Sequence, residues 1–208
     1  MLDKPSKPRT DTRERLLDVA ESAVLAKGFE ATSIEELIVE VGITKSGFFY
    51  HFPDKTALAH ALLHRYLERE NAMLDNLFSR ARELHEDPLH GFLIGLKMFS
   101  ELMADLPNGH PGCLVAAYCY QDRLFDREVR ALNREGVLSW RARFRSLLDE
   151  IEQVNPPRIE VDLDALADMV SALVDGGIIL SKVIDDKGIL PAQVMLYREF
   201  VRAVFLRP

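Results

Sequence analysis

The segment from Thr44 to Lys55 holds the side chains of this sequence that are best suited to specific chemistry. It reads TKSGFFYHFPDK, and Lys45, Ser46 and Gly47 stand together near its start. Lysine donates hydrogen bonds to base edges, serine donates or accepts them, and glycine leaves room for a close backbone approach. Such a set at the start of a short helix suits insertion into the major groove of DNA. The alternative for the same pattern is an ordinary helical hairpin in an all-α core.

Two short helices and a tight turn are expected to position these residues. Thr32 or Ser33 can cap the first helix, because each is followed three residues later by a glutamate. Apolar residues between Ile34 and Val41 recur at helical spacing, and the glycine that follows favours a helix end. Thr44 can cap the second helix, which is too short to be stable alone. The pattern therefore predicts a helix-turn-helix motif over about residues 32–52.

The first third of the sequence resembles TetR/AcrR-type transcriptional regulators. The motifs that carry the resemblance are Gly28-Phe29, Thr32-Ser33 and GITKSGFFYHFPDKTAL over 42–58. Two positions depart from the family's pattern. Ser46 stands where the family often has glycine, and Phe49 stands where it commonly has a tyrosine that contacts phosphate. Because Phe49 has no hydroxyl group, that contact is lost or passes to Tyr50 or His51.

The resemblance implies a one-component, ligand-responsive repressor. It would bind a pseudo-palindromic operator as a homodimer and be released by a small apolar or amphipathic effector. The residues expected at the DNA are Thr32, Thr44, Lys45, Ser46, Gly47, Tyr50, His51 and Lys55. Those at the start of the second helix, 45–47, are expected closest to base edges. The caps and the later residues are better placed for phosphates, which set the register of the protein on the duplex.

The overall composition limits the classes of protein that fit. Hydrophobic residues make up 48% and charged residues 28% of the 208 positions, as in soluble globular proteins. The net charge of −7 argues against a general nucleic-acid coat, which would be strongly basic, but permits a small DNA-reading surface. No phosphate-binding loop, dinucleotide fingerprint, nucleophile elbow or zinc-protease motif occurs. Neither an enzyme nor a cofactor is therefore predicted.

The sequence predicts a cytoplasmic protein that has no part in a membrane. No apolar run follows the polar N-terminus, as a signal peptide would require. The most apolar stretch, 166–184, contains two aspartates and a lysine, which a membrane span seldom accepts. Cys113 and Cys119 do not make a disulfide framework, and this fits a reducing compartment.

The chain is expected to be helical almost throughout. Apolar residues predict helices over 12–27, 54–86, 88–106, 113–122, 126–154, 162–185 and 191–205. The predicted fold is all-α, with a three-helix DNA-binding domain over 9–69 and a larger effector-binding and dimerisation domain over 70–208. A continuous helix joins the two, and it can transmit movement where a flexible linker could not. Residues 1–10 are either a basic arm that touches DNA or a loose end.

The larger domain offers candidates for an effector pocket and for a dimer interface. The pocket candidates, for which plain core is the alternative, are Phe92, Leu96, Phe99, Met103, Cys113, Tyr118, Trp140 and Phe144. The last two helices are apolar over more than one face, which predicts an interface between copies, or else a wholly internal core. The interface candidates are Leu166, Val170, Leu173, Gly177, Ile178, Tyr197 and Val201. Glycine at 176 and 177 would let a neighbouring backbone approach closely.

Cysteine and histidine supply two further hypotheses. Cys113 is expected in the first turn of a helix, where free N–H groups favour a thiolate. An alternative function is thus a regulator that senses thiol-reactive electrophiles through Cys113, with Cys119 reacting more slowly; otherwise Cys113 is a packing residue. His60 and His64 have the spacing of a two-histidine metal site but lack a carboxylate between them. The pair His85 and His90 fits a corner between helices better than a ligand set, so no metal site is predicted.

Overall fold

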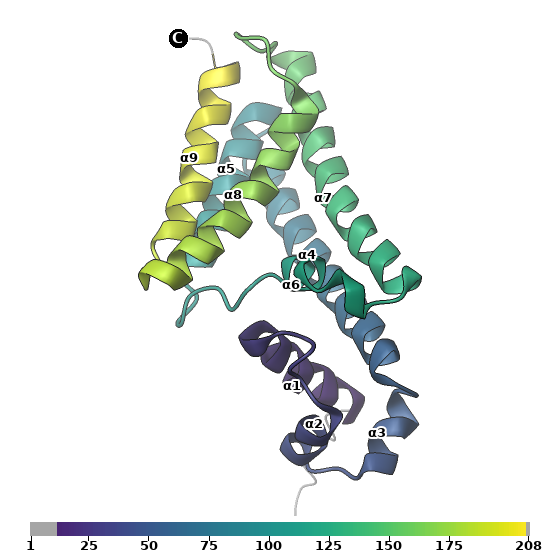
Figure 1. The fold of residues 1–208 in the computed structure, drawn as a ribbon. Coiled ribbons are helices and arrows are strands. Elements are labelled where there is room, and N and C mark those ends of the chain that lie inside the picture. Colours follow the sequence, from purple (N-terminus) through teal and green to yellow (C-terminus); the bar gives the residue numbers. More distant parts are fainter. Residues whose placement is uncertain (1–11, 207–208) are drawn as a thin grey trace, which may run out of the picture. The chain divides into compact units, whose positions relative to one another are not determined.

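The computed structural model describes residues 12–206, and all regular structure in that range is helical (Figure 1). The basic arm hypothesised for residues 1–10 lies outside the described residues. The helices are α1 (Thr12–Lys27), α2 (Ile34–Val41), α3 (Lys45–His51), α4 (Lys55–Leu84), α5 (Pro88–Ala104), α6 (Leu114–Tyr120), a short 3-10 turn (Asp122–Leu124), α7 (Arg127–Val154), α8 (Leu163–Ile184) and α9 (Ile189–Phe205). The predicted all-α fold is confirmed. None of the helices in the described range is both long and apolar enough to cross a membrane.

The chain forms two compact units, which do not follow the order of the sequence. The first unit takes residues up to Tyr66 together with Leu114–Asn133, and the second takes Leu67–Cys113 together with the chain from Arg134 onward. Helix α4 therefore contributes its first part to one unit and its second part to the other. The segment 114–133 packs with the helix-turn-helix region, although the sequence had suggested that it belongs with the larger domain.

An aromatic cluster explains why this segment packs with the first helices. The ring of Phe125 lies 4.9 Å from that of Phe29 and 4.3 Å from that of Tyr118, measured between centroids. The Gln121 side-chain oxygen also accepts a hydrogen bond from the Phe29 amide at 2.8 Å. Gly28 is favoured here, because its φ of +88° lies in the left-handed region that residues with a Cβ atom rarely adopt. These contacts join residues about ninety positions apart, which helical periodicity does not reveal.

Arg65 fixes the start of α4 against α1 within the first unit. Its guanidinium group reaches Glu14 at 3.2 Å, Asp18 at 2.8 Å and Glu21 at 3.0 Å. The Arg65 side chain is only 20% exposed, so loss of these three partners would leave a buried charge without compensation. The network ties α1 to α4, the long helix that follows α3.

The core of the second unit combines α5, α7, α8 and α9 with the second part of α4. Helix α9 packs against both α5 and α8. Buried side-chain hydrogen bonds fix these contacts: the Tyr197 hydroxyl donates to the Leu166 carbonyl and the Ser100 hydroxyl to the Pro191 carbonyl, each at 3.0 Å. Pro191 lies in the first turn of α9, not at its first residue as predicted, and a proline is tolerated there because that turn has no amide partner.

The interface residues predicted from the sequence lie mostly inside this core. Leu166, Val170, Ile178, Tyr197 and Val201 are at most 5% exposed, and Leu173 is half-buried against the same cluster. A Cβ atom on Gly177 would approach Leu190 of the same chain to 3.0 Å, so the close approach predicted there is internal. All of these candidates except Leu173 are therefore enclosed within the single chain. Periodicity showed that α8 and α9 are apolar on several sides but did not show which side faces inward.

Candidate nucleic-acid interface and ligand groove

Local capping interactions build the motif that carries α3. Ser33 caps α2 by accepting a hydrogen bond from the Glu36 amide at 3.2 Å. Gly42 ends the helix at a φ of +74°, and its amide donates to two carbonyls of the last turn. Thr44 then caps α3 by accepting from the Gly47 amide at 3.1 Å. Each of these positions was readable from the sequence, although the choice between residues 32 and 33 as the first cap was not.

Helix α3 turns one side inward and leaves the other exposed. Phe48 is fully buried and anchors the helix. Lys45, Ser46 and Tyr50 are exposed, while Gly47 is half-buried. The Thr44 and Ser46 hydroxyls lie 2.9 Å apart, so the polar groups at the helix start form one cluster. This exposed, hydrogen-bonding face on a rigidly held helix is the feature that a DNA-reading element requires.

Lys45 makes an ion pair that DNA can displace. Its ammonium group lies 3.0 Å from the Glu35 carboxylate, and the two side chains are 61% and 66% exposed. The hydrogen bond from Lys45 is the main cause that lowers the pKa of Glu35. Ion pairs this exposed contribute little to stability, because water screens them. The Lys45 ammonium group thus lies near the start of α3 in a weak ion pair, which it can exchange for another acceptor.

Replacing Lys45 by alanine is expected to relax base preference at one base pair in each half-site. A lysine at this position can donate to guanine O6 and N7, a contact that discriminates by about 1–3 kcal/mol. Binding of the variant to a set of single-substitution operator duplexes measures the effect. An unchanged order of preference across that set would make Lys45 a phosphate contact only.

Two of the predicted DNA contacts have other roles in the folded chain. Thr32 is 1% exposed, and its hydroxyl donates to the Gly28 carbonyl at 2.9 Å, so this side chain does not face a ligand. The ammonium group of Lys55 donates to the Phe29 carbonyl at 2.8 Å and lies 4.5 Å from the centre of the Phe29 ring. Burial lowers the pKa of Lys55. Lys55 secures the turn after α1, and a phosphate would have to compete for it.

The residues predicted to line an effector pocket form a packed core. Phe92, Leu96, Phe99, Met103 and Phe144 are all buried in one cluster. Trp140 and Cys113 are partly buried against that cluster. Tyr118 is the exception, since it belongs to the first unit and its hydroxyl donates to the Ala59 carbonyl at 3.0 Å. Tyr118 thus lies apart from the other candidates, and an effector pocket lined by these residues stays a prediction.

A groove between α4 and α7 offers space that the sequence did not indicate. Its volume is about 630 Å³, and it is lined by Asp75, Phe78, Ser79, Arg82, Ser139, Ala142, Arg143, Ser146, Leu147 and Glu150. Two ion pairs cross it in opposite senses, from Arg82 of α4 to Glu150 of α7 and from Arg143 of α7 to Asp75 of α4. The sequence does contain a signal for this groove: each of the two helices carries a pair of opposite charges seven residues apart.

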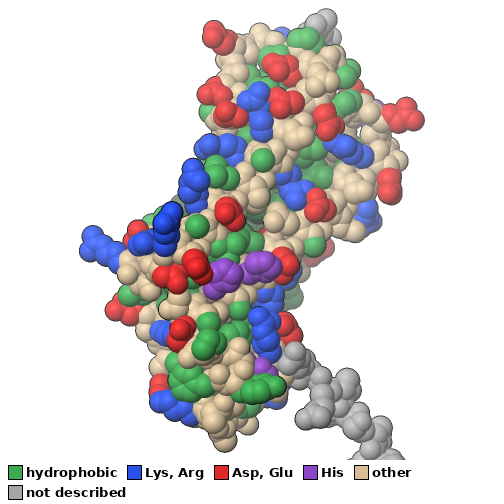
Figure 2. Space-filling model, turned by 90° about the vertical axis from the view of Figure 1, so that its right-hand side faces the viewer, with side chains coloured by type: hydrophobic (Ala, Val, Ile, Leu, Met, Phe, Trp, Pro, Cys, Tyr) green, Lys and Arg blue, Asp and Glu red, His purple; other side chains and the backbone are tan. Residues whose placement is uncertain are grey.

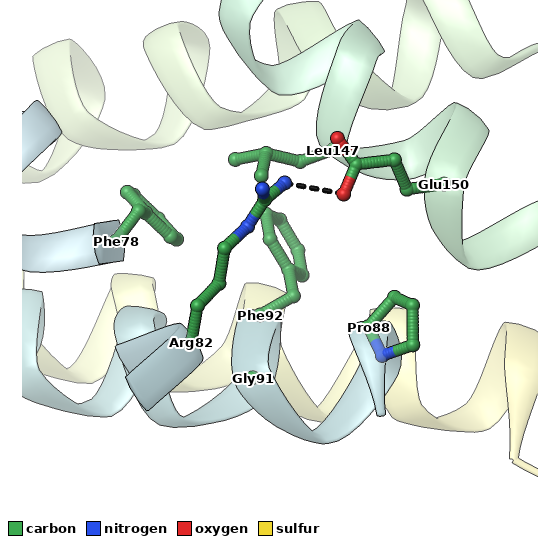
Figure 3. Close-up of a pocket in the computed structure, with 7 residues that line it drawn as sticks. All are labelled: Phe78, Arg82, Pro88, Gly91, Phe92, Leu147 and Glu150. Carbon is green, nitrogen blue, oxygen red and sulfur yellow. Dashed lines mark hydrogen bonds and ion pairs between the residues drawn. The ribbon is translucent and has the colours of Figure 1, made fainter. Parts of the chain in front are cut away.

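The Arg82–Glu150 pair lines both this groove and a smaller hollow, of about 10 Å³, whose lining includes the core residue Phe92. Figure 3 shows the guanidinium and carboxylate groups meeting between α4 and α7, with the Phe78 and Phe92 rings nearby. The two side chains of the pair are 54% and 41% exposed. Because an exposed pair contributes at most about 1 kcal/mol, a ligand can replace it at low cost.

The two cysteines differ in exposure and in their surroundings. Cys119 is exposed, whereas Cys113 is partly buried. The Cys113 thiol hydrogen-bonds the Asp175 carboxyl group, whose pKa is raised by burial. A carboxyl partner disfavours a second negative charge on the sulfur. Cys119 is thus the more accessible of the two thiols, and the faster reaction expected of Cys113 stays a prediction.

The histidines at the α4–α5 corner hydrogen-bond with Asp87, the residue that caps α5. Asp87 caps α5 by accepting from the His90 amide at 2.9 Å, and the same oxygen lies 2.7 Å from His90 Nδ1. His85 Nδ1 accepts from the Asp87 amide at 3.1 Å. The three side chains bring possible metal-ligand atoms within 4.8 Å of one another. Their hydrogen bonds already use these groups for capping. His60 and His64, the other candidate pair, have ring centroids 6.3 Å apart.

Known proteins share both the motif and the fold. Residues 16–62 match the family described as Bacterial regulatory proteins, tetR family. The uncharacterized HTH-type transcriptional regulator YxaF of Bacillus subtilis is 23% identical over 180 residues, covering 86% of this chain and 89% of its own. The repressor BepR of Brucella suis is 31% identical over 81 residues, 38% of this chain and 37% of its own.

Solved structures extend the likeness over the second unit. A TetR-family regulator from Agrobacterium tumefaciens superimposes with a TM-score of 0.76 at 20% identity, covering 93% of this chain and 97% of its own. The reduced form of Escherichia coli NemR gives a TM-score of 0.76 at 19% identity, covering 95% and 98%. At this identity the structures establish the fold alone.

The fold and the exposed α3 define a helix-turn-helix transcriptional regulator. The family match and the curated relatives agree further: residues 16–62 form a helix-turn-helix domain of the TetR family, and the chain as a whole shares the fold of solved TetR-family regulators.

Proposed function

We propose that the protein is a dimeric repressor that binds a pseudo-palindromic operator through α3 and is released by a small effector. The observation that supports this proposal is that α3 has a buried side and an exposed side. Phe48 anchors the buried side, and Lys45 and Ser46 lie on the exposed side. Two copies of α3 would enter successive major grooves about 34–36 Å apart. Helix α4 contributes to both compact units, so it is the element through which effector binding would alter operator binding.

Selection of genomic DNA fragments by the purified protein at moderate salt, followed by sequencing, tests the proposal. A DNA-binding regulator should recover one or a few segments with a palindromic element, and affinity should fall steeply as salt increases. Recovery of fragments at random, or none at all, would contradict operator binding. Transcription from the recovered segment with and without the protein then separates repression from activation.

The outer faces of α8 and α9 support the dimer in this proposal. Large apolar side chains are exposed along both helices: Ile179, Leu180, Val183, Ile184, Leu196 and Phe200. Val183 is 79% and Leu196 58% exposed. Spacing of three to four residues places them along one side of each helix. A contiguous apolar surface of this kind marks an interaction site, and a second copy of the same surface is its simplest partner.

The groove between α4 and α7 is our proposed effector site. A volume of about 630 Å³ is in the range of pockets for small molecules. Phe78 and Leu147 supply apolar surface, while three serines supply hydroxyl groups. Arg143 Nε is buried without a hydrogen-bond partner, so this donor would gain from a ligand that brings an acceptor. An amphipathic carboxylate, with an apolar part and an acceptor-rich end, fits this set.

Decanoate and decanol are matched probes for this site. Decanoate should bind more tightly, because its carboxylate can replace Glu150 on Arg82. Glu150→Gln removes the competing carboxylate and should raise decanoate affinity by about threefold to tenfold, whereas Arg82→Gln should lower it similarly. Isothermal titration calorimetry measures both. Arg145→Gln, which removes a cation of α7 paired with Asp149 and Asp164 outside the groove, is the control. Equal affinity for both probes in all variants would contradict the site.

A further inference from the structure

Helix α3 carries a partly exposed aromatic side chain that has no polar atoms. Phe49 is 42% exposed, and its ring packs edge-on against buried Phe48 at a centroid distance of 5.4 Å. Phe49 stands one helical turn after Lys45, so both lie on the same side of α3. Figure 2 shows hydrophobic side chains at the surface in the part of the molecule formed by the first helices. The buried neighbour restricts the ring and leaves part of it free for a partner.

The chemistry of this side chain restricts what it can contact on DNA. Phenylalanine cannot donate to a phosphate oxygen or to a base edge. Packing uses only part of the side chain, because 42% of it is exposed. In the major groove the one apolar group that distinguishes a base is the thymine C5 methyl. We propose that Phe49 is a specificity-determining residue that reads a thymine methyl in each half-site. This inference rests on the proposed operator binding.

The next residue along α3 is suited to a different role. Tyr50 is 84% exposed and carries a hydroxyl, so it can donate to a phosphate. In this proposal Tyr50 contacts phosphate and sets the register of the protein on the duplex, while Phe49 sets the base preference. Burying one methyl group is worth about 0.8 kcal/mol, which is about fourfold in affinity, and two half-sites give roughly 15-fold.

Replacing thymine by uracil in the selected operator tests this inference, because uracil keeps the base pair and lacks only the methyl group. Affinity is measured by fluorescence anisotropy for duplexes that differ only at this group. The wild-type protein should bind the uracil duplex roughly 15-fold more weakly. Phe49→Ala should bind both duplexes equally, and Tyr50→Ala, the matched control, should keep the wild-type ratio while binding both more weakly. This cycle isolates the contact between ring and methyl.

A second measurement uses the wild-type protein alone. Changing the critical thymine to cytosine removes the methyl, and 5-methylcytosine at that position should recover about fourfold per half-site. An equal loss on uracil for wild type and Phe49→Ala, or no loss for wild type, would overturn the inference while leaving operator binding intact. Failure of the wild-type protein to prefer any DNA segment would instead overturn the proposed function.

Discussion

A Leu196→Arg variant is expected to be a folded monomer that binds the operator at least about a hundredfold more weakly than the wild type. The exposed apolar surface of α8 and α9 would receive a charge at a position that is 58% exposed in the single chain, so the chain's own core is untouched. A monomer has one reading helix and loses the gain of bivalent binding, which is typically 10²–10⁴. Light scattering gives the mass, and anisotropy gives the affinity.

Leu84→Arg is the matched control for this experiment. Leu84 is also an exposed leucine, at 68%. It is the last residue of α4 and so belongs to neither α8 nor α9. This variant should remain a dimer with wild-type affinity. A dimer that survives Leu196→Arg would move the interface to another surface. Gly177→Arg is unsuitable as a test, because the new side chain would collide with Leu190 and disturb the fold.

Local rules predicted the helices and the reading motif well. Ser33, Gly42 and Thr44 stand where hydrogen-bond capping and positive φ require them, and the structure uses all three. Such signals lie within four residues of one another, so a single sequence contains them. Predicted helix bounds are within two residues of those found, because caps, prolines and glycines mark helix ends in the sequence.

Contacts between distant segments were not predictable in the same way. Tyr118 was assigned to the effector pocket because it is aromatic, but its partners Phe29 and Phe125 place it in the first unit. The interface candidates lie mostly inside the single chain for a related reason. Helices α8 and α9 are apolar on two sides, and only the packing of α9 against α5 and α8 decides which side of each becomes core. Hydrophobicity predicts that an apolar surface will be buried, but it does not predict which other surface will cover it.

Charge distribution shows the same limit. Figure 2 presents acidic and basic side chains interspersed over the visible face. The net charge of −7 therefore says little about a local site. The groove between α4 and α7 depends on which charges meet across two helices, as Arg82 meets Glu150. Its sequence signal, opposite charges seven residues apart, is common on exposed helices and gains meaning only when a second helix carries the complementary pair.

Acid is expected to destabilise the second unit through His110. Burial, with Lys182 and Arg69 nearby, lowers the pKa of His110 from 6.5 to about 4. As pH falls below about 6.5, the unfolded chain binds a proton at this histidine that the folded chain does not bind until about pH 4. The stabilising effect of a neutral His110 is thus complete above pH 6.5 and is lost as pH falls to 4. At pH 4 the loss is at most about 3 kcal/mol.

Urea unfolding at pH 7.0, 5.5 and 4.0 of the wild type and His110→Asn measures this loss. As pH falls, the free energy of unfolding should decrease less for the variant than for the wild type, because asparagine cannot take up the proton. The difference between the two should reach up to about 3 kcal/mol at pH 4. Asp175→Asn is a control of opposite sign. Burial raises the pKa of Asp175 above 3.8, so its charge destabilises the fold as pH rises, and removing it should help most at pH 7. Parallel pH profiles for wild type and His110→Asn would show that His110 takes up its proton as readily in the folded chain as in the unfolded one.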